Sequence, residues 1–392
     1  MSSDIAYGLK GIVAGETKIT EVDFENGKLY FRGYDIEELA AHSTFEEVFW
    51  LLVTGELPKK HLRTWFRGLL TQDRRIITSE RRELNSMLDH AFLHQPLLAL
   101  ANFVTSRGAL TPTTRDAKIL PQKAMEVGTE LCAVFPTVIA HLIRWGQSPP
   151  RFANPKDIYI QPHPKLSHAA NFLWLLRGEE YPTKAEEKAL DIALILHADH
   201  EFNASTFNGV RGAASTGATP HACIVAGLGV LSGPNHGGAN EMAMRMFEDI
   251  KHPDQAAKWI VEYMVNKKQR VFGFGHRLYK HRDPRTEILK PLSKKLCEAR
   301  GLPWYAIASK VEDITREILT SRGREDLPPN IDFYSPVLFA ALGIPAMYMP
   351  LIFAMGRIAG WTAHMKEQYE HNMLTRPLAK YTGPASRPYP EK

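Results

Sequence analysis

The sequence predicts a mainly α-helical protein with a small β-hairpin near its N-terminus. Apolar residues recur at helical spacing over most of the chain, and some of these stretches follow clear helix-start signals. Helical stretches do not alternate with strands, which disfavours a doubly wound nucleotide-binding sheet. The chain has 392 residues, more than one hydrophobic core usually serves, so two domains are expected.

The hairpin is predicted from residues 17–22 and 29–32, which are rich in β-forming side chains. Between them, Glu25-Asn-Gly-Lys28 has the composition of a tight turn. The two short runs and the turn together favour an antiparallel pair of strands.

Two capping-box patterns mark helix starts further along the chain. They are Thr44 with Glu47, and Thr183 with Glu186, the second opening a helix through Leu196. Helices are also expected over residues 124–145, 166–176, 240–249, 254–265, 284–300 and 305–319.

Residues 336–356 contain no charged side chain and are long enough to span a bilayer. Prolines and a glycine interrupt the stretch, however, so we expect two short buried helices and no membrane span. Arg357 follows directly, and a charge beside a buried segment needs a partner. The tail, residues 381–392, is rich in proline and is expected to be irregular.

The overall charge and the cysteines argue against several classes of protein. A net charge of +5, from 48 basic and 43 acidic residues, does not by itself indicate nucleic-acid binding. Cys132, Cys223 and Cys297 are odd in number and contain no Cys-x-x-Cys pair, so neither a disulfide framework nor a thiolate zinc site is expected. The first nine residues lack a secretory signal pattern, so a reduced, cytoplasmic location is expected.

Four segments offer proton donors and acceptors. They are His197-Ala-Asp-His200-Glu201, Gly233-Pro-Asn-His236-Gly-Gly238, Phe272-Gly-Phe-Gly-His276-Arg277 and Asn330-Ile-Asp332-Phe333. A reaction at a weak carbon acid needs such a set, because a base must remove the proton while donors stabilise the oxygen that gains charge.

His197 and His200 both face the apolar side of a predicted helix. His197 is as well explained by a structural role in the core, whereas His200, at the helix end, is the better candidate for ligand contact. A metal site on His-x-Asp-His is a weaker alternative, because the spacing lacks the His-Glu-x-x-His arrangement.

His236 is expected just before a helix N-terminus, where the helix dipole disfavours a charged imidazole. A neutral ring there can donate a hydrogen bond to a developing oxyanion. The alternative is an exposed histidine in a plain glycine-rich loop.

Residues 267–285 carry seven basic side chains against one acid, Asp283. Clustered lysines and arginines suit phosphate groups. A solvated turn or a nucleic-acid patch are the alternatives, although aromatic residues are too few here for base stacking.

Asp332 is predicted to be a base with a raised pKa, because its neighbours are apolar. The alternative role is the N-cap of the next helix. Arg285, Arg357 and Arg376 supply three guanidinium groups, which match a dicarboxylate through paired hydrogen bonds.

Taken in order, these segments resemble the citrate synthase family. The resemblance is carried by Arg32-Gly-Tyr-Asp-Ile36, His197-Ala-Asp-His-Glu201, Gly233-Pro-Asn-His-Gly-Gly-Ala-Asn-Glu241, Gly273-Phe-Gly-His-Arg-x-Tyr-Lys280, Asp283-Pro-Arg285, Gly360-Trp-x-Ala-His364 and Arg376-Pro with Tyr381-x-Gly-Pro384. It covers nearly the whole chain. One departure is Asn235, where many members have leucine.

The resemblance implies a nearly all-α homodimer. Residues 1–236 and 343–392 would form a large domain, and residues 237–342 an inserted small domain that closes over the ligands. The implied reaction joins acetyl-CoA to oxaloacetate and, with water, gives citrate and CoA, with no metal or other cofactor.

The resemblance also implies a role for each site residue. Asp332 would abstract the methyl proton of acetyl-CoA, His236 would hydrogen-bond the thioester oxygen, and His276 would polarise the ketone of oxaloacetate. Oxaloacetate would be held by His200, Arg285, Arg357 and Arg376, the last reaching into the partner's site. Coenzyme A would contact Gln269, Arg270, Val271, Phe272 and Gly273.

Three other activities stay open at this stage. The related 2-methylcitrate synthases share these motifs and take propionyl-CoA, and one extra methylene changes binding by only ~1–3 kcal/mol. A metal-dependent hydrolase would use His197, Asp199 and His200. A nucleic-acid-binding module would use residues 267–285 and bind with a steep salt dependence.

Overall fold

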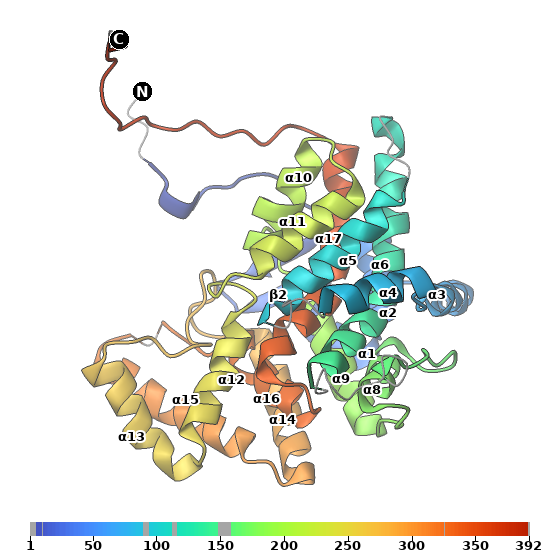
Figure 1. The fold of residues 1–392 in the computed structure, drawn as a ribbon. Helices are drawn as coiled ribbons and strands as arrows, with labels where there is room; N and C mark the ends of the chain where they lie inside the picture. Colours follow the sequence, from blue (N-terminus) through green and yellow to red (C-terminus); the bar gives the residue numbers. More distant parts are fainter. Residues whose placement is uncertain are drawn as a thin grey trace.

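The computed structural model describes residues 5–9, 11–88, 94–111, 116–147, 158–324 and 326–390. These residues are mainly helical, with one small sheet near the N-terminus (Figure 1), so the predicted fold class is confirmed. The first helices are η1 (Tyr7–Leu9), α1 (Ile36–His42), α2 (Phe45–Thr54), α3 (Lys60–Asp73), α4 (Thr78–Leu88), α5 (Pro96–Ala109), η3 (Ala117–Ile119), α6 (Leu120–Gln147), α8 (His168–Arg177) and α9 (Lys184–His197). The later helices are η4 (Ser205–Arg211), α10 (Gly212–Ser215), α11 (Pro220–Leu231), α12 (Ala239–Ile250), η5 (Pro253–Gln255), α13 (Ala256–Val261), η6 (Glu262–Asn266), α14 (Pro284–Arg300), α15 (Trp304–Ser321), α16 (Ile331–Ala341), η7 (Ala346–Tyr348) and α17 (Met349–Glu370).

The predicted hairpin is present as β1 (Thr20–Asp23) paired antiparallel with β2 (Lys28–Phe31), with Val22 opposite Leu29. A third short strand, β3 (Tyr34–Asp35), pairs with β2 and was not predicted. A strand of two residues contains no alternation of apolar and polar side chains, so no sequence pattern could reveal it.

The predicted helices are confirmed, including both capping boxes, at the starts of α2 and α9. The stretch 254–265 is helical but not one α-helix, because it passes from η5 through α13 into the wider turns of η6. Helices α1, α3, α4, α5 and α11 were not predicted. The proline-rich tail is irregular over the described residues 381–390, while residues 391 and 392 lie outside them.

The apolar stretch 336–356 forms parts of two buried helices, α16 and α17, as expected. The expectation that both are short is wrong for α17, which has 22 residues. Pro350 occupies the first turn of α17, where a missing N–H group leaves no hydrogen bond unmade, so it opens the helix and does not end it.

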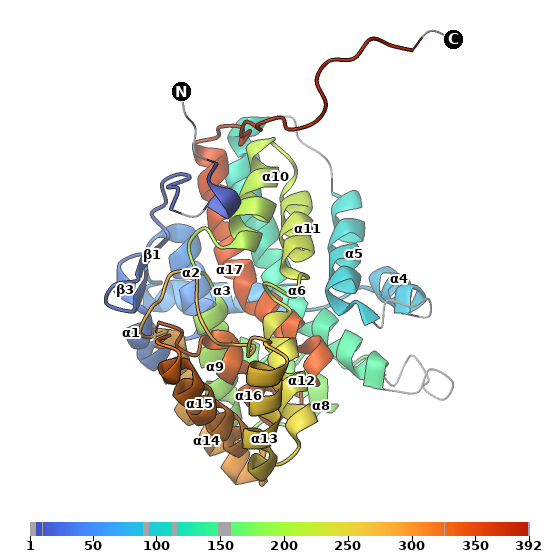
Figure 2. The same ribbon diagram turned by 90° about the vertical axis from the view of Figure 1, so that its left-hand side faces the viewer.

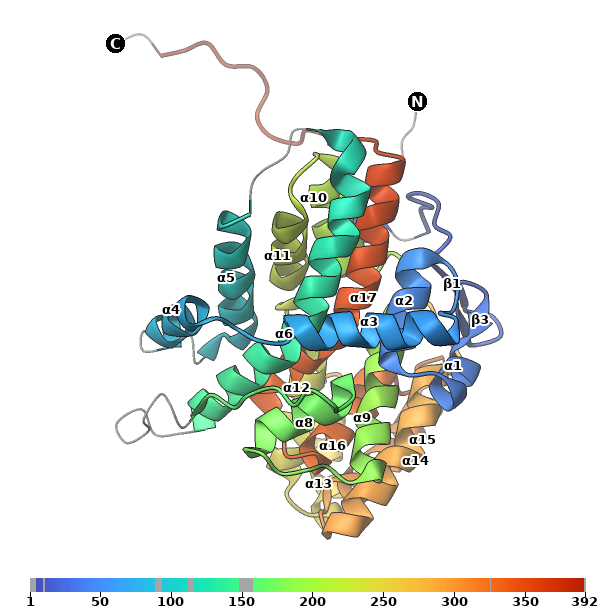
Figure 3. The same ribbon diagram turned by 90° about the vertical axis from the view of Figure 1, so that its right-hand side faces the viewer.

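Helices α6 and α17 run beside each other through the centre of the molecule (Figures 1 and 3), and α2 and α9 also pack on α17. A second group, α12 to α16, packs together at the lower end of the molecule. This group falls within residues 237–342; the division into two domains stays a prediction. The C-terminal tail leaves the end of α17 and extends away from the helices (Figures 1 and 2).

By length and composition alone, one described helix, Ala117–Gln147, is apolar enough to cross a membrane. Its apolar window is 89% buried in the fold, which is typical of a core helix. Helix α16 and the segment Ala346–Glu370 pass the same test only as a pair, and the pair is bent by 119°.

The contact between α6 and α17 depends on the absence of a side chain at Gly128. A Cβ atom there would lie 2.2 Å from Thr362 Oγ1. We expect Gly128→Ala to lower the free energy of unfolding by about 1–3 kcal/mol through overpacking. Gly68 on α3 has open space around it, so the control Gly68→Ala should stabilise by up to about 1 kcal/mol. Urea unfolding measures both, and equal stability of the two variants would contradict this close packing.

Candidate active site

Three aromatic rings from two distant segments meet at the centre of the site. The ring centroids of His200 and His276 are 5.1 Å apart, and Tyr279 lies 5.5 Å from the first and 4.8 Å from the second. The Tyr279 hydroxyl is 3.3 Å from His200 Nε2. The structure therefore brings together two predicted site residues around a fully buried tyrosine that sequence reasoning missed, although it lies in the Gly-His-Arg-x-Tyr segment.

Arg285 is held at the start of α14 by Asp283, which is the N-cap of that helix. Arg285 Nε and Nη2 donate to the two carboxylate oxygens at 2.9 and 2.8 Å. Burial alone would raise the pKa of Asp283, but Arg285 outweighs it and lowers this pKa. Asp283 also accepts from the N–H of Ile331 at 3.1 Å, which ties the start of α16, and with it Asp332, to the guanidinium.

Arg357 is a buried cation whose side chain forms no ion pair with a carboxylate in the described chain. Its Nε donates to the carbonyl of His197 at 2.7 Å, and its guanidinium lies 4.7 Å from the Phe353 ring centre. Nη1 is buried without a hydrogen-bond partner among the described atoms. Burial lowers the pKa of Arg357 to about 10, so the group remains charged at neutral pH. A buried, uncompensated guanidinium favours an anionic ligand.

His276 is neutral, with its proton on Nε2. Its Nδ1 accepts the backbone N–H groups of Leu278 and Tyr279 at 3.1 and 3.2 Å, so this nitrogen carries no hydrogen. Burial, then the charge of Arg285, lowers the pKa of His276 to about 4. Nε2–H is therefore a neutral donor.

His236 has the opposite tautomer. Its Nε2 accepts the backbone N–H of Ser205 at 3.3 Å and lies 2.9 Å from Ser205 Oγ, so the proton belongs on Nδ1. The expected neutral ring is present, with its pKa lowered to about 3. The expected cause was the dipole of α12, but burial is the main cause, followed by Arg357.

Asp332 is a carboxylate with an unsatisfied oxygen. The N-cap of α16 is Asn330, whose Oδ1 accepts the N–H of Asp332 at 2.9 Å, so the alternative capping role is not filled by Asp332. Oδ1 of Asp332 is shielded from solvent and has no partner among the described atoms. Burial raises its pKa to about 7, even though Arg285 lowers it. A carboxylate with this pKa is a stronger base than an ordinary one.

Helix α17 grips the residues that follow α9 through backbone groups. Besides the bond from Arg357 to His197, the N–H of Gly360 donates to the Ala198 carbonyl at 2.9 Å. A Cβ on Gly360 would lie 2.2 Å from Asp199 Oδ1, so only glycine permits this approach.

A buried chain of hydrogen bonds also links α17 to the segment after α9. Asp199 Oδ2 accepts from His364 Nε2 at 3.0 Å and from Thr20 Oγ1 at 2.6 Å. Arg211 can only donate, and it contacts His364 Nδ1 at 3.4 Å, which places the histidine proton on Nε2 toward Asp199. Because His200 follows Asp199 directly, these contacts fix His200 relative to α17.

The alternative metal site on His197, Asp199 and His200 is not formed. His197 Nδ1 lies 2.7 Å from the carbonyl of Ala193, its ring packs against Phe353, and burial lowers its pKa to about 3. Asp199 is engaged by His364. Among the residues that the structure describes, no group of three or more His, Cys, Asp or Glu side chains could hold a metal.

A basic cavity of about 480 Å³ lies beside His276. Of the residues expected to bind coenzyme A, Gln269, Arg270 and Val271 line it, whereas Phe272 and Gly273 lie outside its lining. None of the described lining residues is acidic. The cationic side chains of this lining are Lys268, Arg270, Arg277, Arg322 and Arg324.

Arg376 is not part of this site in the single chain. It lies in the exposed tail, which extends away from the helices (Figure 2). The tail also exposes large apolar side chains, namely Met373, Leu374, Leu378, Tyr381 and Tyr389.

The arrangement is that of a mainly helical enzyme with a cationic pocket, two neutral imidazoles and a carboxylate of raised pKa. The family description "Citrate synthase, C-terminal domain" matches residues 8–378. The chain is 36% identical over 389 residues to the citrate synthase of Haloferax volcanii, covering 98% of this chain and 97% of that protein. It is also 34% identical over 382 residues to the 2-methylcitrate synthase of Shewanella oneidensis, covering 97% and 95%.

A solved structure, the citrate synthase of Thermoplasma acidophilum in a ternary complex with carboxymethyl coenzyme A and oxaloacetate, is also similar. It matches with a TM-score of 0.88 and 30% identity over 98% of each chain. The chain therefore belongs to the citrate synthase family.

Replacing Asp199 by asparagine should weaken the grip between α17 and the segment after α9. Asparagine loses the charged acceptor of two hydrogen bonds, so we expect the free energy of unfolding to fall by about 1.5–3 kcal/mol at pH 7. Because the native pKa of Asp199 lies below its ordinary 3.8, this loss should persist as pH falls toward 3.8 and shrink only at lower pH. Chemical denaturation at several pH values measures it.

The matched control is Asp326→Asn, which removes an exposed partner of Arg324 and should cost less than about 1 kcal/mol. Similar losses for the two variants would show that the Asp199 contacts add no more than a surface pair.

Proposed function

We propose that this enzyme condenses acetyl-CoA with oxaloacetate and water to give citrate and CoA. The observation that carries the proposal is Asp332, a partly buried carboxylate whose Oδ1 is shielded from solvent and whose pKa is raised to about 7 beside two arginines. Membership of the citrate synthase family supports the same reaction. No metal or other cofactor is needed for the steps proposed here.

In the first step, Asp332 takes a methyl proton from the thioester, and His236 donates from Nδ1–H to the thioester oxygen. A neutral donor suits an oxygen that becomes enol-like, and one such donor contributes about 3–4 kcal/mol to catalysis. The enol carbon then attacks the ketone carbon of oxaloacetate. His276 donates its Nε2 proton to the ketone oxygen, which becomes the hydroxyl of citryl-CoA, and water then releases CoA.

The anion pocket supports oxaloacetate as the acceptor, with His200, Arg285 and Arg357 as its ligands. Arg285 is already neutralised by Asp283, so within this pocket Arg357 is the described cation that has no carboxylate partner. A dicarboxylate needs a second cation. We assign that role to Arg376 from a second subunit, because the tail that carries it leaves the body of its own chain.

A homodimer is supported by the surface of α11. Ala222, Val225, Ala226, Gly229 and Val230 recur at helical spacing and are exposed or only partly buried. Small side chains allow helices to pack closely, and an apolar stripe of this kind favours a second copy of the same chain as partner.

The basic cavity beside His276 supports binding of coenzyme A, because its cations match phosphate groups. We further propose that residues 237–342 close over residues 1–236 and 343–392 to exclude water from the thioester intermediate.

The second candidate substrate is propionyl-CoA, which would give 2-methylcitrate. It is favoured by the 34% identity to a 2-methylcitrate synthase, close to the 36% identity to a citrate synthase.

The central test is release of free thiol from acetyl-CoA or propionyl-CoA in the presence of oxaloacetate. We expect thiol release with acetyl-CoA, and kcat/KM should fall as pH drops below about 7, because Asp332 must be ionised to act as the base. Asp332→Asn should lower kcat by a factor of about 100 or more. Calorimetry should still show that this variant binds oxaloacetate. Asp313→Asn, an exposed carboxylate on α15, is the control. No thiol release with either acyl-CoA would refute the function.

The role of Arg376 can be tested by complementation. Asp332→Asn and Arg376→Ala subunits, with different tags, are co-expressed and purified as heterodimers. If Arg376 serves the partner's site, one of the two sites regains both residues and about half the wild-type rate returns. A heterodimer no more active than either variant alone would place the action of Arg376 within its own subunit, or outside the site.

A further inference from the structure

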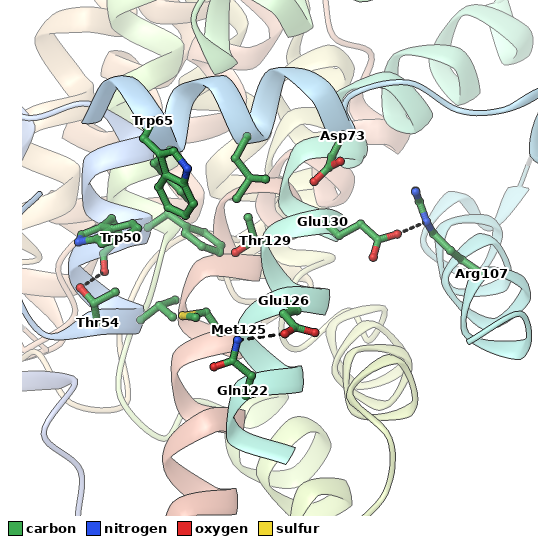
Figure 4. A pocket seen from close by; sticks show the side chains of 14 residues that line it. Trp50, Thr54, Trp65, Asp73, Arg107, Gln122, Met125, Glu126, Thr129 and Glu130 are labelled. Atoms are coloured by element: carbon green, nitrogen blue, oxygen red, sulfur yellow. Dashed lines mark hydrogen bonds and ion pairs between the residues drawn. The ribbon is translucent and has the colours of Figure 1, made fainter. Parts of the chain in front are cut away.

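A second cavity, of about 430 Å³, lies on a different part of the molecule, between α2, α3 and α6, with Arg107 of α5 at one edge (Figure 4). Its volume falls within the roughly 300–1,000 Å³ typical of small-molecule sites. None of its lining residues takes part in the proposed reaction, and the cavity neither belongs to nor depends on that site.

One end of this cavity is aromatic. Trp50 meets Trp65 edge to face with ring centroids 6.1 Å apart, and it meets Phe66 in the same way at 5.3 Å. Trp65 is 57% exposed, which is unusual for so large an apolar side chain and leaves part of its ring open to a ligand. Such surfaces bind flat apolar groups and attract cations through the ring faces.

The other end is acidic (Figure 4). Asp73 is the last residue of α3 and faces this end together with Glu130 of α6. The only cation in the described lining is Arg107, whose Nε lies 2.6 Å from Glu130 and 3.5 Å from Glu80. Arg107 is therefore shared by two carboxylates, and Asp73 has no ion-pair partner among the described residues.

The surroundings of Asp73 favour a cation at this end. The C-terminal end of a helix carries a partial negative charge, and Asp73 sits at that end of α3. Burial and the neighbouring Glu130 raise the pKa of Asp73 even though Arg107 lowers it, because both disfavour the ionised carboxylate. A bound cation would interact favourably with the helix end and would stabilise the ionised form of Asp73.

We propose that this cavity is a binding site for an organic cation with a flat apolar body, of the arylalkylamine class. The ring packs against Trp50 and Trp65, and the ammonium group contacts Asp73. The aromatic end of the cavity matches the ring of such a ligand, and the acidic end matches its ammonium group. Neither a purely apolar molecule nor an organic anion satisfies both ends.

The test uses phenethylamine as the probe, with the full-length enzyme and isothermal titration calorimetry. Its neutral analogue 2-phenylethanol and its anionic analogue 3-phenylpropionate share the ring and differ in charge. We expect phenethylamine to bind once per subunit, and at least about tenfold more tightly than 2-phenylethanol, because it adds a charge-assisted hydrogen bond. We expect no binding of 3-phenylpropionate.

Two variants separate the two ends of the cavity. Asp73→Asn should reduce the affinity for phenethylamine about tenfold and leave that for 2-phenylethanol unchanged. Trp65→Ala should reduce the affinity for both phenethylamine and 2-phenylethanol. Asp249→Asn, an exposed carboxylate on α12, is the control and should change neither. Circular dichroism and thiol release check that each variant is folded and active.

Three outcomes would overturn the proposal. The first is equal binding of phenethylamine and 3-phenylpropionate. The second is an Asp73→Asn variant that binds phenethylamine as tightly as the wild type. The third is absence of phenethylamine binding. If Trp65→Ala then lowers the mass of the assembly measured by sedimentation, a second copy of the chain occupies the cavity instead.

Discussion

The packing of α17 against the residues that follow α9 is the constraint on which the active site depends. Arg357, Gly360 and His364 lie on one face of α17 and hold His197, Ala198 and Asp199 in turn. The same contacts satisfy two backbone carbonyls at the end of α9, where a helix leaves such groups unpaired. His200 comes next in the chain, so these three hydrogen bonds fix its position relative to Arg357. A ligand that touches both residues meets a pre-formed pocket.

The electrostatics of the site follow from burial combined with an incomplete balance of charge. Arg285 has a carboxylate partner in Asp283, whereas the contacts of Arg357 with the described residues are to a carbonyl and a ring face. Desolvation, and after it the positive potential of these arginines, keeps His236 and His276 neutral. Desolvation acts in the opposite direction on Asp332 and makes it basic. Burial thus keeps the two imidazoles neutral and makes the carboxylate more basic than usual at the same pH.

Local sequence patterns predicted most of the central helices but not all of their roles. Capping boxes and apolar spacing act within a few residues, and they located α2, α9, α12 and α14. The same rules could not decide whether Asp332 or Asn330 caps α16, since both residue types suit a cap. The length of α17 was missed because a proline inside an apolar run looks like a helix breaker until its position in the first turn is known.

The sequence by itself determined the helical class, the family resemblance and the identity of the residues that carry the proposed chemistry. The tertiary structure decided how those residues act. Asp199 and His364 are separated by 165 positions, and no spacing rule connects them. The ring nitrogen that carries the proton in His236 depends on a contact with Ser205, and the raised pKa of Asp332 depends on which atoms exclude water from it. Protonation and hydrogen bonding are set by neighbours in space, and only the folded chain specifies those neighbours.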